Sequence, residues 1–265
     1  YTVMYSIEDC YGNEVASGVR PCDSTKVTLY VPDAQLWSMD EPNLYTVIAR
    51  LQRRNESYDD LYVNVGVRSY TVTPDGGFSI NGVPTPLRGV SRHQDRKGAG
   101  VAITKEMMEE DMALILEMGA NTIRLAHYQH AQYFYDLCDK YGLVAWAEIP
   151  YITEHLPEAT ANTLSQMEEL VTQNYNHPSI ICWGLSNEIT VTTGVTEDLT
   201  ANHRLLNDLC HRLDATRPTT MAHAFMLDPN DPFVQLPDIC SYNLYYGWYL
   251  GELLSLIHIS EPTRR

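Results

Sequence analysis

The sequence predicts a multidomain chain in which an antiparallel β-sandwich is followed by an incomplete (β/α)8 barrel. Residues 1–73 contain short segments rich in β-branched and aromatic residues, separated by turn residues. After residue 73, short apolar strands alternate with amphipathic helices, which is the pattern of parallel βα units. A closed barrel typically needs about 250 residues, whereas 265 − 73 = 192 remain here. We therefore expect about six of the eight βα units, in an internal fragment of a longer protein.

The first part of the chain has three strand candidates, Val27–Val31, Leu44–Ala49 and Leu61–Val65. Tyr11–Asn13 and Pro32–Asp33 carry turn chemistry. This spacing is typical of an antiparallel sandwich, and we expect the first strand or strands of that sandwich to be missing. The sandwich should act as a packing module and carry little chemistry.

The second part alternates strands and helices in order. Its strand candidates are residues 86–90, 122–125, 143–148, 180–185, 219–222 and 239–242. Its helix candidates are residues 105–118, 131–141, 160–174 and 197–214. Thr104 is a capping residue for the first helix, and Gly119 and Gly142 end the first two helices. We expect the open edges of such an incomplete barrel to make the fragment prone to aggregation.

The composition excludes several classes of function. With 18 Lys and Arg against 34 Asp and Glu, the net charge is −16, so nucleic-acid binding through a basic face is not expected. No run of about 18 apolar residues occurs, so no membrane span is expected. The six cysteines lack metal-binding spacing, and we expect buried free thiols at Cys138, Cys182, Cys210 and Cys240.

The sequence leaves the compartment open. The chain starts at Tyr1 without an initiator Met or a signal peptide, and we expect the true N-terminus to be absent. Free thiols weakly favour a reducing compartment such as the cytoplasm, and the sequence supports no narrower assignment.

Polar residues gather where the predicted barrel strands end, at residues 91–96, 126–128, 148, 186–188 and 243–248. Active-site groups of such barrels lie at these carboxyl ends. One polar residue alone fits a helix cap or a structural ion pair, but five strand ends together favour a site. Carboxylates, Arg, His, Asn and aromatic rings suit a neutral, polyhydroxylated ligand, because aromatic faces pack on sugar C–H bonds while planar polar groups bind hydroxyls.

Four motifs follow one another along the chain, namely Asn81–Pro84, Leu87–His93, Asn121–Tyr128 and Trp183–Glu188. In this order and with this spacing they resemble glycoside hydrolase family 2. The end of that family's immunoglobulin-like domain is similar to residues 36–38, 42–45 and 66–68. The resemblance extends to about Leu253.

The resemblance implies three parts. Residues 1–73 would be the C-terminal part of an immunoglobulin-like β-sandwich domain, truncated at its N-terminus. Residues 74–253 would be a catalytic TIM-barrel domain, truncated at its C-terminus. Residues 254–265 lose amphipathic register and look like a non-native tail joined to a genuine fragment.

The activity implied by the resemblance is that of a retaining exo-glycosidase. Arg92–Arg96 and Asn243–Trp248 resemble its β-galactosidase branch, so the implied substrate is a terminal, non-reducing β-galactoside. A β-glucuronidase or β-mannosidase of the same family stays open, and a glucuronidase would need pocket Lys or Arg beyond Arg92, Arg96 and Arg124. An inactive carbohydrate-binding fragment is the second alternative. Whether the parent protein is homo-oligomeric is left open.

The resemblance also implies roles for single residues. Glu188 matches the general acid/base, and Asn187 matches the residue that hydrogen-bonds the sugar 2-hydroxyl. The other residues expected to bind substrate are His93, Asp95, Arg124, His127, Tyr245 and Trp248. Glu148 is expected to orient its neighbours in the pocket. The alternatives are structural histidines at His93 and His127 and core packing by Trp248.

The family nucleophile is a Glu at the end of strand seven, and the chain offers no good match for it. Glu261 lies too close to Trp248 for a helix, a loop and a strand, and Pro262 follows it where the family has an aromatic residue. We therefore expect the nucleophile to be missing and this fragment to be inactive. Some relatives carry Mg²⁺, but Glu154 and His155 are displaced from the expected register, so no metal ligand is assigned.

Overall fold

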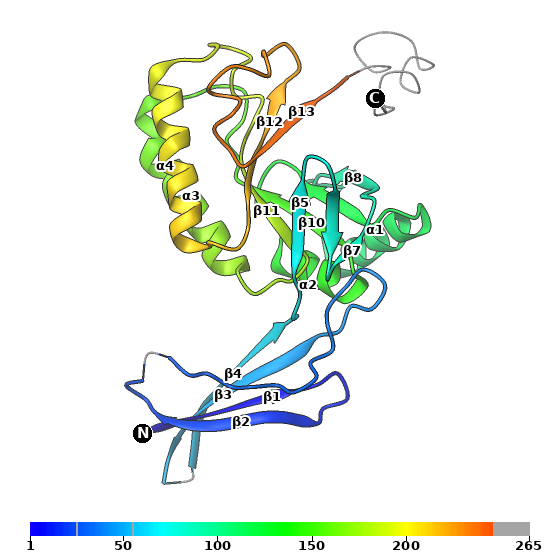
Figure 1. The fold of residues 1–265 in the computed structure, drawn as a ribbon, viewed down its shortest axis with the longest axis vertical. Coiled ribbons are helices and arrows are strands. Elements are labelled where there is room, and N and C mark those ends of the chain that lie inside the picture. Colours follow the sequence, from blue (N-terminus) through cyan, green and yellow to red (C-terminus); the bar gives the residue numbers. More distant parts are fainter. Residues whose placement is uncertain (25, 55, 246–265) are drawn as a thin grey trace. The chain divides into compact units, whose positions relative to one another are not determined.

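A four-stranded antiparallel sheet begins the chain in this computed structural model, which describes residues 1–24, 26–54 and 56–245 (Figure 1). The strands are β1 (Thr2–Glu8), β2 (Glu14–Pro21), β3 (Tyr45–Arg53) and β4 (Glu56–Val65). Their order in the sheet is β2-β1-β3-β4. The predicted strands at 44–49 and 61–65 fall within β3 and β4.

The predicted strand Val27–Val31 is wrong. Its residues alternate between half-buried and exposed, as in a strand, but the segment has no strand assignment. Leu29 lies against Gly18 of β2, where an added Cβ would meet the leucine side chain at 3.0 Å. Alternating burial therefore reports an extended segment packed on the sheet, and says nothing about whether a neighbouring strand accepts its backbone hydrogen bonds.

A small sheet of order β5-β6-β7 follows. Its strands are β5 (Tyr70–Thr73), β6 (Gly77–Ile80) and β7 (Val83–Pro84). β6 begins directly after the tight turn with Gly77 at φ 64°, a left-handed conformation that glycine adopts without strain.

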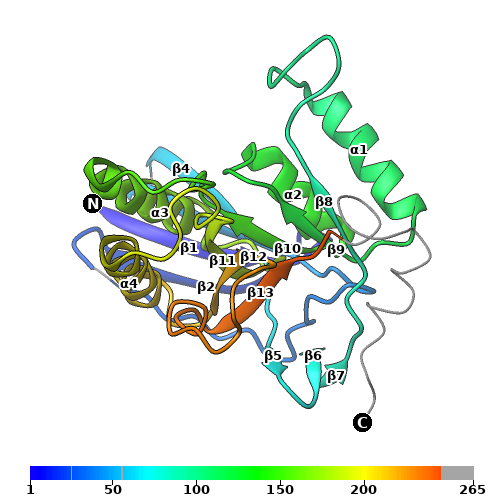
Figure 2. The ribbon, with the colours of Figure 1, turned by 90° about the horizontal axis from the view of Figure 1, so that it is seen from above.

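The third sheet has six parallel strands in the order β13-β12-β11-β10-β9-β8 (Figure 2). The strands are β8 (Gly89–Arg92), β9 (Thr122–Leu125), β10 (Val144–Glu148), β11 (Ile180–Asn187), β12 (Thr219–Ala224) and β13 (Ile239–Asn243). The helices are α1 (Lys105–Glu117), α2 (Gln132–Tyr141), α3 (Thr160–Asn174) and α4 (Glu197–Leu213), with a 3-10 turn at Pro157–Ala159. In both views α3 and α4 run side by side (Figure 1, Figure 2). This alternation is the incomplete barrel that the sequence predicts.

The first barrel strand begins later than predicted, at Gly89 instead of Pro86. The side chain of Asn121 explains the shift. Its Oδ1 accepts the amide of Arg88 at 2.7 Å, and its Nδ2 donates to the carbonyl of Pro86 at 2.9 Å. These hydrogen bonds occupy the amide of Arg88 and the carbonyl of Pro86, so in this described stretch only the carbonyl of Arg88, which accepts from the amide of Asn121 at 2.9 Å, bonds backbone to backbone. Pro86 has no amide proton to give to a ladder.

The chain divides into two compact units. Unit 1 comprises residues 1–126, 130–146 and 173–181. Unit 2 comprises residues 127–129 and 147–172 together with, among the residues described, 182–245. Large buried side chains of unit 1 are Trp37, Met112, Ile123, Phe134 and Tyr135, and those of unit 2 are Met167, Leu170, Trp183 and Phe233.

The cysteines are free thiols, and Cys138, Cys182 and Cys210 are buried as predicted. Cys240 contradicts the prediction, because it is exposed. It lies on β13, the last strand of the sheet, whose residues are at best half-buried. Within the described part of the chain, no helix is both long enough and apolar enough to cross a membrane.

Candidate active site

Two polar residues of unit 2, Asn187 and Glu188, lie at the end of β11. β11 is buried along its whole length and delivers Asn187, which Glu188 follows. The backbone of Glu188 has φ 46°, a left-handed conformation that is uncommon for a residue with a side chain. Its amide donates to the carbonyl of Ala222 on β12 at 2.8 Å, which fixes the turn. Such outliers cost about 1–3 kcal/mol and cluster at functional sites.

Residues at and after the end of β13 contact this pair. The hydroxyl of Tyr245 donates to Oε1 of Glu188 at 2.8 Å, and Nδ2 of Asn243 donates to Oδ1 of Asn187 at 2.9 Å. The structure thus brings together three predicted site residues, Asn187, Glu188 and Tyr245. Asn243 belongs to a motif of the sequence, but no role could be assigned to it before its contact with Asn187 was known.

His127 and Glu148 form a second pair in unit 2. Nδ1 of His127 lies 2.6 Å from Oε1 of Glu148, which is fully buried. A cavity of about 270 Å³ includes the residues that directly follow this pair in the chain. It is lined by Tyr128, Gln129, Ile149, Pro150, Gln166 and Glu169. A buried carboxylate beside a half-buried imidazole fixes the orientation of the histidine ring.

The other predicted residues that the structure describes belong to unit 1. His93 and Asp95 are exposed and line a cavity of about 440 Å³, together with Leu114 and Met118 from the α1 side. The guanidinium of Arg124 lies 4.7 Å from the ring centre of Trp146 on β10. The indole N–H of Trp146 is buried and has no hydrogen-bond acceptor among the described residues, a donor that the sequence did not single out.

Two arginines counted as pocket residues in the sequence have structural partners instead. Arg92 is buried, bonds Asp111 at 2.8 Å and lies 3.0 Å from Nδ1 of His130. Burial, as the main cause, lowers the pKa of His130 to about 4, so its ring is neutral beside the arginine. Arg96 forms an ion pair with Glu110 on α1. Both guanidinium groups thus form ion pairs with carboxylates of α1.

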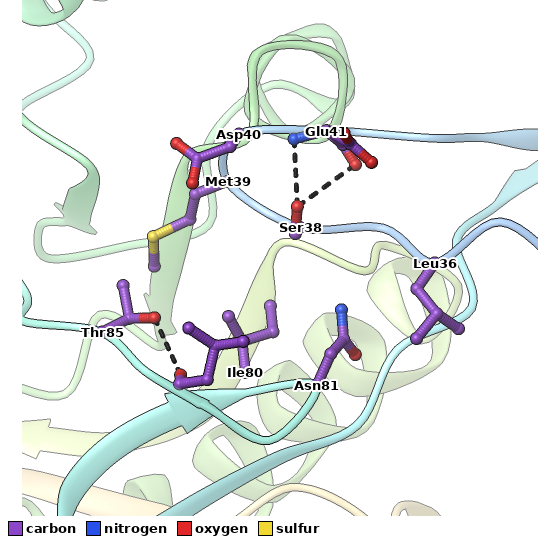
Figure 3. A pocket seen from close by; sticks show the side chains of 9 residues that line it. Leu36, Ser38, Met39, Asp40, Glu41, Ile80, Asn81 and Thr85 are labelled. Carbon is purple, nitrogen blue, oxygen red and sulfur yellow. Dashed lines mark hydrogen bonds between the residues drawn. The ribbon is translucent and has the colours of Figure 1, made fainter.

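A further cavity of unit 1, of about 220 Å³, has none of the predicted site residues in its lining (Figure 3). It is lined by Leu36, Ser38, Met39, Asp40, Glu41, Ile80, Asn81, Val83 and Thr85. Ser38 Oγ accepts the amide of Glu41 at 3.0 Å, so the polar groups of this loop bind one another.

Glu148 and His155, the residues considered as Mg²⁺ ligands by the family resemblance, are each hydrogen-bonded to other residues. Glu148 is bonded to His127, and both ring nitrogens of His155 are engaged, with Tyr151 at 2.5 Å and Asp198 at 2.8 Å. Glu148 and His155 therefore do not fit as joint metal ligands.

Another acidic cluster, Asp136, Asp139 and His177 of unit 1, is close enough to hold a cation. Asp139 bonds His177 at 2.6 Å and also accepts hydrogen bonds from the hydroxyl and the amide of Ser179. The carboxylate of Asp139 is thereby used within the protein.

Trp248, Glu261 and the predicted tail 254–265 lie outside the described residues. The roles given to them by the sequence stay predictions.

Two family models match the chain. One, described as "Glycosyl hydrolases family 2, TIM barrel domain", matches residues 71–260, and one described as "Glycosyl hydrolases family 2" matches residues 2–68. These matches confirm the predicted order of domain types, a sandwich-type domain followed by an incomplete barrel.

Relatives carry two kinds of name. A crystal structure of an FMN-binding beta-glucuronidase from Facaelibacterium prausnitzii L2-6 is 58% identical with a TM-score of 0.93, covering 96% of this chain and 40% of that one. A beta-glucuronidase of Bacteroides fragilis is 38% identical over 91% of this chain and 36% of its own length. A beta-galactosidase of Thermoanaerobacter pseudethanolicus is 32% identical over 69% of this chain and 24% of its own length. The chain thus spans well under half the length of these relatives.

Proposed function

Because the chain belongs to glycosyl hydrolase family 2, we propose that its parent protein is a retaining exo-β-glycosidase whose general acid/base is Glu188. One observation carries the proposal. Glu188 stands in a left-handed turn at the carboxyl end of a buried strand, with its carboxylate bonded to the hydroxyl of Tyr245. A carboxyl group fixed in this way is suited to passing a proton to and from a substrate oxygen.

In such a reaction, two carboxyl groups about 5–5.5 Å apart flank the glycosidic bond. Glu188 gives its proton to the leaving oxygen while the nucleophile attacks the anomeric carbon, and then takes a proton from the incoming water. Tyr245 occupies Oε1, so we place the transferred proton on Oε2 of Glu188. Asn243 binds Oδ1 of Asn187, so the NH₂ group of Asn187 is the donor for the sugar 2-hydroxyl.

We place the nucleophile outside the residues described. Glu148, the other strand-end carboxylate of unit 2, is fully buried and bonded to His127. That environment suits a group that orients the histidine and does not suit attack on a substrate. The chain alone is therefore expected to give no turnover.

For the substrate we propose terminal β-glucuronides. The 58% identical structure and the 38% identical relative support this choice, because both are named beta-glucuronidases. Since Arg92 and Arg96 are committed to α1, we expect the cation that binds the glucuronate carboxylate to come mainly from outside the described residues. β-Galactosides are the second candidate, favoured by the β-galactosidase-like motifs and by the 32% identical relative.

The test uses a chimera in which residues 2–245 replace the matching segment of the Facaelibacterium enzyme. Chain and chimera are assayed on the nitrophenyl β-glycosides of glucuronate, galactose and mannose. We expect no turnover by the chain and hydrolysis of the glucuronide by the chimera, with NMR showing the β-anomer as first product. Glu188→Gln should lower kcat on an alkyl glucuronide about 10²–10⁴-fold.

Four outcomes would contradict the proposal. An unchanged rate in the Glu188→Gln chimera would contradict the acid/base role of Glu188. An inverted first product would contradict the retaining mechanism. A galactoside preference in the chimera would select the second candidate. Binding of sugar by the chimera without any turnover would favour the carbohydrate-binding alternative.

A further inference from the structure

We propose that Tyr151, His155 and Asp198 form a positioning relay that holds the Asn187–Glu188 turn in place for proton transfer. The inference rests on the proposed role of Glu188. None of the three residues is a catalytic residue in it, because they act through the backbone that carries Glu188. The argument has three steps, all within unit 2.

The loop after β10 forms hydrogen bonds with both the amide and the carbonyl of Asn187. The amide of Asn187 donates to the carbonyl of Tyr151 at 2.9 Å, and the amide of Thr153 donates to the carbonyl of Asn187 at 3.2 Å. On the other side, the amide of Glu188 is bonded to Ala222. The turn is thus clamped between this loop and β12, and a shift of the loop would move the residue that carries the carboxylate.

The clamping loop is itself under strain and needs an anchor. Thr153 has φ 68°, a genuine outlier for a β-branched side chain. Such conformations persist only where the surroundings over-determine them. The hydroxyl of Thr192 donates to the carbonyl of Thr153 at 3.2 Å, but Ile152, Thr153 and Glu154 are all exposed and contribute little packing.

The relay supplies that anchor. The hydroxyl of Tyr151 lies 2.5 Å from Nδ1 of His155, and Nε2 of His155 lies 2.8 Å from Asp198 in the first turn of α4. Asn202 of α4 donates to the hydroxyl of Tyr151 at 3.1 Å, and the tyrosine ring stacks on His203 with centroids 5.1 Å apart. Asn202 and His203 of α4 thus hold the buried Tyr151 directly, and Asp198 of α4 holds it through His155.

The direction of the hydrogen bonds follows from protonation. Burial raises the pKa of Tyr151 to about 12, so its hydroxyl keeps its proton, and we assign that proton to the contact with Nδ1 of His155. The imidazole then carries its proton on Nε2 and donates to the carboxylate of Asp198. Each member has a defined donor or acceptor role, which rigidifies the loop.

In the first step, formation of the glycosyl-enzyme, a misplaced general acid slows only substrates whose leaving group needs the acid. Alkyl leaving groups require protonation, whereas dinitrophenolate leaves with little help. Loosening the relay should therefore lower kcat/KM, which reports this first step, for an alkyl β-glucuronide with little change for a dinitrophenyl one. A general loss of folding would slow both substrates together.

The test compares Tyr151→Phe, His155→Gln and Asp198→Ala in the chimera, with melting temperatures recorded for each. We expect losses of about 10- to 100-fold in kcat/KM on the alkyl substrate, since an ångström of misplacement costs up to about 100-fold. On the dinitrophenyl substrate the loss should stay within about threefold. Asp198 is 60% exposed, so Asp198→Ala should fold, and Asp198→Asn, which keeps an acceptor oxygen, should rescue most of the rate.

His211→Gln is the matched control. It removes a second His–Asp pair, His211 to Asp238 at 2.8 Å, which also involves α4 but lies at the opposite end of the helix from Asp198. It should leave both rates unchanged. Amide hydrogen exchange of the chain itself gives a second readout. The relay variants should speed exchange at Asn187 and Thr153, and the control should not.

Equal losses on both substrates, or unchanged exchange at these two amides, would overturn the relay. Absence of protection at Asn187 in the unmutated chain would do the same. If the unmutated chimera hydrolyses no glycoside, the proposed function fails, and the exchange data alone decide whether the relay holds the turn.

Discussion

Glu188 combines a proposed chemical role with a backbone conformation that opposes stability. Its φ of 46° is sustained by hydrogen bonds from Glu188 to Ala222 and between Asn187 and the loop after β10. Thr153, in that loop, is strained in the same sense at φ 68°. The two strained residues are linked in unit 2, because Thr153 bonds Asn187, the residue before Glu188. Such strain is expected where the surrounding structure fixes a functional group and not where it maximises stability.

Buried histidines should make the chain sensitive to mild acid. His203 is fully buried, and that burial lowers its pKa to about 4 from an ordinary value of 6.5. Between these values the unfolded chain binds a proton that the folded chain does not. The free energy of unfolding therefore falls as pH drops from about 6.5 towards 4, by on the order of 3 kcal/mol for this residue.

Urea unfolding followed by circular dichroism at pH 7.5, 6.5, 5.5 and 4.5 measures this loss. His203→Gln should flatten the slope between pH 6.5 and 4.5, whereas His211→Gln, at a partly exposed histidine, should keep it. Asp214 and Asp238, whose carboxyl pKa values are lowered from 3.8, lose their contribution only at lower pH. A slope unchanged by His203→Gln would refute the assignment.

At the scale of elements, the helix ends carry testable sequence information. α2 ends at Gly142, with φ 70°, where an added Cβ would meet the carbonyl oxygen of Met39 at 2.2 Å. Gly119, just after α1, has φ 76° but open space around it. We expect Gly142→Ala to destabilise the chain by more than about 3 kcal/mol, because strain and a backbone clash add.

Gly119→Ala is the control and should cost only about 1–2 kcal/mol, the penalty of a side chain in the left-handed region. Urea unfolding of both variants at pH 7.5 provides the comparison. Equal losses would mean that the Met39 loop moves aside at no cost, and would contradict the clash.

The helices could be predicted closely because their signals are local. α1, α2, α3 and α4 each begin and end within one residue of the expected positions, as cap residues and glycine stops indicate. Strands depend on partners elsewhere in the chain. The segment Val27–Val31 has the alternation of a strand and no ladder, and the side chain of Asn121 delays the start of β8. Neither effect can be inferred from the local pattern.

The candidate site divides in the same way. Residues at strand ends, such as Glu188 and Tyr245, could be nominated because parallel strands bring their carboxyl ends to one edge. The contacts of His155 could not be predicted from the sequence. Its partner Asp198 is 43 residues away on another element, and the sequence offered only a displaced metal ligand as its interpretation. The orphaned N–H of Trp146 likewise becomes visible only when its surroundings are known.

At the scale of the whole molecule, the edges of the six-stranded sheet should govern behaviour in solution. Within the described residues, β8 and β13 each have a neighbouring strand on one side only. Beside β8, α1 exposes Leu114 at 57% and Met118, just after the helix, at 72%, and both line the 440 Å³ cavity. Unpaired strand edges next to exposed apolar side chains favour association between chains.

Net charge opposes that association, so salt should control it. Chains of charge −16 repel one another at low ionic strength, and salt screens the repulsion without weakening apolar contacts. Size-exclusion chromatography with light scattering should therefore show larger species at 0.5 M NaCl than at 20 mM. Leu114→Lys with Met118→Lys should suppress the increase, whereas Leu205→Lys, at an exposed leucine of α4, should not. A monomer at both salt concentrations, or equal suppression of the larger species by the Leu205 variant, would show that chains do not associate through the β8–α1 side.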